Sequence, residues 1–77
     1  MPTVKNLPRS STLNRPNAGR QYEALTGKKV PTGMVAGHVK VPGEGNKVFL
    51  VPITPAQNHH TNTDPYKTRF KPVPISE

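Results

Sequence analysis

Residues 34–51 read MVAGHVKV, then PGEGN, then KVFLV, and they carry the clearest secondary-structure pattern in the chain. In the first run, Val35, Val39 and Val41 recur at the period of two that places side chains on one face of a strand. The middle run combines a proline, two glycines and an asparagine, which is typical of a turn. The last run is rich in the β-branched and aromatic residues that favour strands. We therefore predict a β-hairpin over residues 33–53.

A single short helix is predicted ahead of the hairpin, over residues 17–27. Its first residue is an asparagine, which is a preferred N-cap. Ala18, Tyr22 and Leu25 recur at the spacing of one helical face. Gly27 suits the left-handed position that ends many helices. Because so short a helix is marginal in isolation, we expect it to need packing against another element.

Prolines dominate the rest of the chain: there are ten in 77 residues, spread from Pro2 to Pro74. Each one removes a backbone donor and disfavours a helix interior or a central strand. Hydrophobic residues make up 31% of the chain, against roughly 45–50% in a typical globular protein. The sequence therefore predicts a mostly irregular, extended chain with little secondary structure, ordered by partners rather than by a core of its own.

Three regions follow from this composition. Residues 1–16 are expected to form an extended basic N-terminal arm. Residues 17–53 hold the predicted helix and hairpin as a small central unit. Residues 54–77 are expected to form an extended C-terminal arm, rich in proline and in basic and aromatic residues.

Charge indicates an acidic partner. Eleven lysines and arginines stand against four acids, so the net charge is +7. Such a chain has affinity for nucleic acid, anionic lipid or acidic protein surfaces. The basic residues are nevertheless scattered, with no run longer than Lys28-Lys29, which is thin for a protein dedicated to condensing nucleic acid. No apolar run is long enough to span a membrane.

Catalytic and metal-binding patterns are weak. The four acids, Glu23, Glu44, Asp64 and Glu77, form no recognisable catalytic motif, and cysteine is absent. His59-His60 with Asp64 is the only cluster that resembles a metal site, and His38 would have to complete it. Adjacent residues of a strand point to opposite faces, so the two histidines cannot easily share one ion. We expect no enzyme activity, cofactor, metal or small-molecule substrate.

Two sets of residues are predicted to contact partners. Isolated apolar residues would dock in separate pockets of a partner: Val4, Leu7, Leu13, Tyr22, Leu25, Val48, Phe49, Leu50, Tyr66, Phe70, Val73 and Ile75. Basic residues would contact acidic surfaces or nucleic acid: Lys5, Arg9, Arg15, Arg20, Lys67, Arg69 and Lys71. Residues 66–71 alternate aromatic and basic side chains, which suits either stacking on bases or docking as a tail with the charges at the rim.

In composition the chain resembles the small, extended, proline-rich proteins that line or cement viral shells. The resemblance implies a minor structural protein of a virion, a staple that bridges several copies of a major capsid protein. In that role the arms would dock their apolar residues in separate grooves. The hairpin would extend a neighbour's sheet.

Two alternatives stay open. The first is a small ribosomal or other ribonucleoprotein component, cytoplasmic or organellar, that is ordered by RNA. The second is an adaptor or inhibitor that adds a strand to one folded partner.

Overall fold

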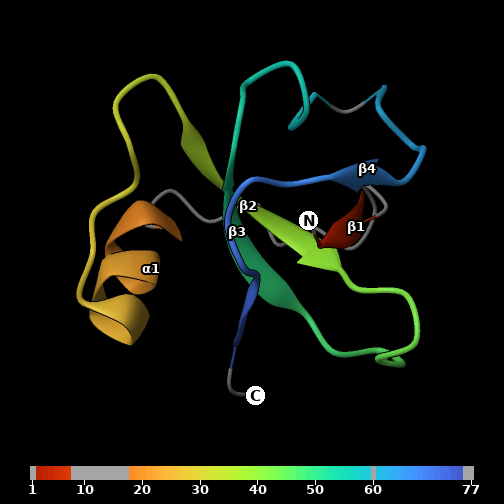
Figure 1. Ribbon diagram of the computed structural model, residues 1–77, viewed down its shortest axis with the longest axis horizontal. Coiled ribbons are helices and arrows are strands. Elements are labelled where there is room, and N and C mark those ends of the chain that lie inside the picture. The colour runs from red at the N-terminus through yellow and green to blue at the C-terminus, as the bar shows by residue number, and fades with distance from the viewer. Residues whose placement is uncertain (1, 8–17, 60, 76–77) are drawn as a thin grey trace.

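Five strands and one helix make up the computed structural model, which describes residues 2–7, 18–59 and 61–75. In chain order the elements are β1 (Thr3–Asn6), α1 (Ala18–Thr26), β2 (Val35–Lys40), β3 (Phe49–Ile53), β4 (Tyr66–Lys67) and β5 (Val73–Pro74). The strands form one antiparallel sheet in the order β4-β1-β2-β3-β5. Figure 1 shows α1 at one end of this sheet, with β1 and β4 towards the other.

The hairpin predicted over residues 33–53 is present as β2 and β3. The two strands pair in antiparallel register from Val35 opposite Ile53 to Val39 opposite Phe49. Gly43 and Gly45 in the connecting loop have φ angles of +91° and +66°. Residues with a Cβ rarely adopt such angles, so these glycines allow the chain to reverse between the strands.

The two faces of the sheet bury different sets of residues. One face, called here the core face, is formed by Val4, Val39, Phe49, Val51 and Ile53, with Tyr66 and Phe70 packed against it. The opposite face, called here the helix face, carries Leu50, which packs with Ala18 and Tyr22 of α1 and with Ala36 and Val73. Every residue of β3 is buried, because this strand is covered on both faces.

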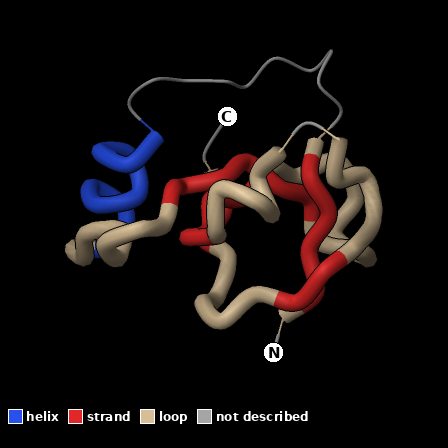
Figure 2. Tube along the Cα trace, turned by 90° about the horizontal axis from the view of Figure 1, so that it is seen from above, coloured by secondary structure: helices blue, strands red, loops and turns tan. Residues whose placement is uncertain are grey.

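The helix predicted over residues 17–27 is present as α1, and it packs beside the strands (Figure 2). Ala18 and Tyr22, one turn apart, are buried against the sheet. Leu25 was placed on the same face from its spacing, but it lies in the last turn and is 45% exposed. The helix therefore contacts the sheet mainly through its first turns.

The predicted fold class is wrong. The chain is neither mostly irregular nor dependent on partners for a core, because both terminal regions add strands to the central hairpin. The radius of gyration is 11.2 Å, which matches the roughly 11–12 Å of a compact chain of this length. Among the described residues, the largest fully buried side chains are those of Val4, Val39, Leu50, Val51, Pro52, Ile53 and Thr68.

Proline fails to prevent the sheet because of where the strand prolines fall. Backbone groups along a strand point alternately to the two neighbouring strands. Ile75 N–H donates to Val48 C=O at 2.9 Å, so the backbone groups of Val48 point towards β5 and away from β2. Pro52 lies four residues further along the same strand, so by alternation its backbone groups point the same way. The described pairing of β3 with β5 covers only Phe49 and Leu50. No described strand is paired at the position of Pro52 on that side, so the missing N–H of Pro52 costs the sheet no hydrogen bond.

Because the core belongs to this chain, the isolated protein should unfold in one cooperative thermal transition. Circular dichroism of the purified chain measures this. A non-cooperative, featureless melt would contradict the assignment of the core to the chain itself.

Gly37 is the glycine on which close packing depends. A Cβ placed there would overlap Ile53 Cδ1 and would stand 3.0 Å from Ile53 Cγ1 and 3.2 Å from Asn58 Oδ1. We predict that Gly37→Ala lowers the free energy of unfolding by about 1–3 kcal/mol, measured by denaturant titration.

The matched control is Gly19→Ala. Its new methyl group would meet nothing within 4 Å, and alanine in place of glycine in the first turn of α1 should leave stability unchanged or raise it by up to about 1 kcal/mol. If the two substitutions changed the free energy of unfolding equally, the close contact with Ile53 would not be what excludes a larger side chain at residue 37.

Candidate functional site

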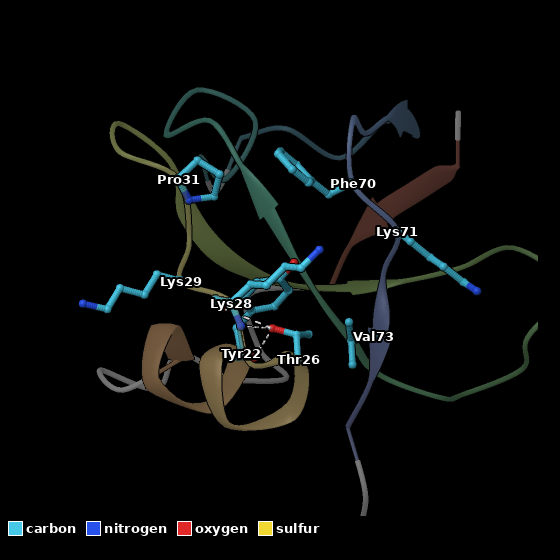
Figure 3. A pocket seen from close by; sticks show the side chains of 8 residues that line it. All are labelled: Tyr22, Thr26, Lys28, Lys29, Pro31, Phe70, Lys71 and Val73. Carbon is cyan, nitrogen blue, oxygen red and sulfur yellow. Dashed lines mark hydrogen bonds between the residues drawn. The ribbon is translucent and has the colours of Figure 1, made fainter.

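An open groove of about 320 Å³ lies between the end of α1 and the segment that leads into β5 (Figure 3). It is lined by Tyr22 and Thr26 of α1, by Lys28, Lys29 and Pro31 of the following loop, and by Phe70, Lys71 and Val73. The groove thus joins residues 22–31 with residues 70–73, two segments that are far apart in the sequence.

The first wall is shaped by the way α1 ends. Gly27 has a φ of +75°, and its N–H donates to Glu23 C=O at 2.7 Å. The Thr26 hydroxyl donates to Tyr22 C=O at 2.8 Å and accepts from Lys28 N–H at 3.1 Å. These bonds satisfy groups that the helix end would leave unpaired, and they hold the backbone of Lys28 against the last turn.

The apolar floor is anchored in the core. Tyr22 is 6% exposed and belongs to the cluster around Leu50, against which Val73 also packs. Phe70 is half-buried and packs on the core face. Side chains held in this way present a preformed apolar surface to a ligand.

Lysines form the rim. Lys28, Lys29 and Lys71 are all exposed, and Figure 3 shows Lys28 across the middle of the groove, with Lys29 and Lys71 extending outward on opposite sides. Arg69 adds a guanidinium 5.7 Å from the centroid of the Phe70 ring. Among the described residues no acid lines the groove, so the described lining combines cations with an apolar surface.

The predicted apolar anchors are placed mainly in the chain's own interior. Val4, Tyr22, Phe49 and Leu50 are buried, Leu7, Val48, Tyr66, Phe70, Val73 and Ile75 are partly buried, Leu25 is exposed, and Leu13 lies outside the described residues. The buried residues have little surface left for a partner.

The predicted basic contacts are exposed wherever they are described. This holds for Lys5, Arg20, Lys67, Arg69 and Lys71, whereas Arg9 and Arg15 lie outside the described residues. Of this set only Lys71 lines the groove. Lys28 and Lys29 were missed as contacts, because they were considered only as the longest run of basic residues in the chain.

Tyr66 was expected either to stack on bases or to dock in a partner's pocket, but its side chain already makes contacts within this chain. Its hydroxyl donates to Asn6 Oδ1 at 2.5 Å. The same Asn6 donates through Nδ2 to Gln57 C=O at 2.6 Å and to Asn62 C=O at 3.2 Å. Burial raises the pKa of Tyr66 to about 12, because the phenolate would lose hydration that the neutral hydroxyl needs less. This leaves Phe70 as the aromatic side chain of residues 66–71 that reaches the groove.

The histidine cluster does not form a metal centre among the described residues. His59 is exposed, and its Nδ1 lies 2.8 Å from Thr61 Oγ1. His60 lies outside the described residues. Within residues 2–7, 18–59 and 61–75, no three potential metal ligands among histidine, cysteine and acidic residues lie together.

Comparisons with known proteins find no family model, no curated protein and no solved structure that matches this chain. In the part of the chain that the structure describes, no helix has the length and apolar character needed to cross a membrane. The function must therefore be argued from the groove and the surface charges.

The pKa of Tyr66 predicts a decline of stability in alkali. Below about pH 10 the phenol is neutral in both states, so its contribution is complete. Between about pH 10 and pH 12 only the unfolded chain readily releases the proton, and stability should fall as the pH rises. Denaturant titrations across this range should show the fall in the wild type.

Two variants isolate the effect. Tyr66→Phe should lack this component of the pH dependence. In Tyr22→Phe, which leaves Tyr66 as the only tyrosine, phenolate absorbance should report a midpoint of about 12 in the folded protein. A midpoint of about 10, as in a solvated phenol, would contradict the burial of the hydroxyl.

Proposed function

We propose that the protein is a non-enzymatic module that binds single-stranded nucleic acid, as a component of a ribonucleoprotein particle. The observation that supports this most directly is the groove, whose described lining combines an apolar floor that includes Phe70 with a rim of Lys28, Lys29 and Lys71 and contains no acid. Proteins that bind single strands combine these two elements: cations follow the phosphates, and aromatic side chains contact the bases.

Nucleic acid suits this surface better than an acidic protein does. If Tyr66 and Phe70 docked as a tail, both rings would have to enter a partner's pockets, but Tyr66 packs against this chain's own core and donates its hydroxyl to Asn6. What stays exposed around the groove is charge. The centres of protein–protein interfaces are depleted in lysine, whereas phosphate contacts depend on it.

A single strand suits the groove better than a duplex. In a duplex the bases are stacked inside, so the apolar floor would have no base to contact. Bases of a single strand can be splayed out onto an aromatic side chain. The groove's volume, about 320 Å³, lies at the lower end of the range for ligand pockets and suits a small number of bases rather than a long stretch.

The capsid staple and strand addition by the hairpin were both expected from a fold that the structure does not have. A capsid staple was inferred from extended arms without a core, and that fold class is wrong. Strand addition by the hairpin would use the outer edge of β3, part of which β5 of the same chain already occupies. Residence in a virion stays a prediction on which the fold has no bearing.

Salt dependence tests the proposal. Fluorescence anisotropy with a labelled single-stranded RNA of about twelve nucleotides should show affinity that falls steeply with salt. The slope of the logarithmic plot should be about −0.7 for each phosphate neutralised. Replacing Lys28, Lys29 and Lys71 together by glutamine should reduce the magnitude of that slope by about 2. The same RNA annealed to its complement should bind more weakly.

Lys47→Gln is the matched control, because Lys47 is an exposed lysine that lies 3.9 Å from Glu44 in the hairpin loop, apart from the groove. It should leave the slope almost unchanged. Wild-type protein that binds no RNA at low salt, or a triple variant that binds like the wild type, would contradict the proposal.

A further inference from the structure

A second set of lysines lies on the sheet itself. Val4 is opposite Tyr66 in the pairing of β1 with β4, and both belong to the core face. Side chains alternate along a strand, so Lys5 and Lys67, which follow these two residues, point to the other side. Lys40 is directly opposite Lys5 in the pairing of β1 with β2, and it therefore points the same way. We call Lys5, Lys40 and Lys67 the lysine face.

The helix leaves this part of the sheet uncovered. The lysine face lies on the same side of the sheet as α1, but α1 packs against β2, β3 and β5 and not against β1 or β4. Figure 1 shows β1 and β4 at the far end of the sheet from α1. Lys5 and Lys67 are exposed, and Lys40 is half-buried.

The pairing of Lys5 with Lys40 is unfavourable in the free protein. Like charges directly opposite each other on neighbouring strands destabilise a sheet. The only ion pair among the described residues joins Lys47 and Glu44 in the hairpin loop, so neither Lys5 nor Lys40 gains an acidic partner there. In a small domain with a limited core, a ligand that supplies negative charge would remove this repulsion.

We propose that the lysine face is a second phosphate-binding surface, which contacts the backbone of the strand whose bases enter the groove. This inference rests on the proposed function. Adjacent strands lie about 4.8 Å apart, so flexible lysines on three neighbouring strands can each reach a different phosphate. The three side chains that define the face are all cations. The face therefore suits a phosphodiester backbone, which is recognised by charge, better than a protein partner.

The decisive variant is Lys5→Glu, because the proposal predicts opposite changes in stability and binding. An acid opposite Lys40 replaces a repulsive pair with an attractive one, so the melting temperature should rise by about 1–8 °C. Affinity for the single-stranded RNA should fall, and the magnitude of the salt slope should decrease by at least about 0.7. If Lys5 had only a structural role, the Lys5→Glu variant would be more stable and would bind the RNA as well as the wild type does.

Lys67→Gln is the second variant. Lys67 is exposed at the end strand β4 and opposite Thr3 rather than another lysine. The Lys67→Gln substitution should reduce the magnitude of the salt slope by about 0.7 without a rise in melting temperature. Lys47→Gln again serves as the control and should change neither quantity.

The outcomes separate the two proposals. If the groove variant loses affinity while Lys5→Glu and Lys67→Gln bind like the wild type, the lysine face is refuted and the groove stands. If only the lysine-face variants lose affinity, the groove is refuted. A wild type that binds no RNA refutes both. If Lys5→Glu weakens binding to phosphatidylserine vesicles but not to RNA, the surface is a membrane contact and the proposal is overturned.

Discussion

The burial of β3 on both faces is the constraint on which the other elements depend. Phe49, Val51 and Ile53 point to the core face, while Leu50 and Pro52 point to the helix face. Adjacent apolar side chains of this strand point to opposite faces of the sheet, and both faces must be shielded from water. A hairpin alone could not bury both faces. The helix covers one side, and Tyr66 and Phe70 cover the other. A chain with few apolar residues therefore builds two small clusters that share one strand.

Hydrogen bonds of Asn6 supplement the small hydrophobic core in holding the terminal strands in place. Asn6 connects β1 with the loop after β3 and with Tyr66 of β4, through partners that are 51 to 60 residues away in the sequence. Such hydrogen bonds fix the register of a strand that is only four residues long. Each contributes modestly to stability, but breaking one would leave a partly buried group without its partner.

Charge and apolar surface are used separately in this molecule. Most of the large apolar side chains belong to the two clusters, and among the described residues Leu25 is the one large hydrophobic residue that is exposed. The groove is the exception, since Phe70 and Val73 belong to the core and also line the site. The same packing that holds the C-terminal segment on the sheet thus positions Lys71 on the side of the groove opposite Lys29 (Figure 3).

The sequence by itself determined the hairpin and the helix, because their signals are local: alternating valines, a glycine-containing turn, and apolar spacing that ends at Gly27. It also determined the excess of positive charge. Tertiary structure alone decided that the terminal segments join the sheet, since strands of two to four residues have no periodicity to detect. The effect of proline likewise depends on which neighbour each backbone group faces. The placement of Lys5 opposite Lys40, and of Lys28 near Phe70, follows only from pairing and packing between segments far apart in the chain.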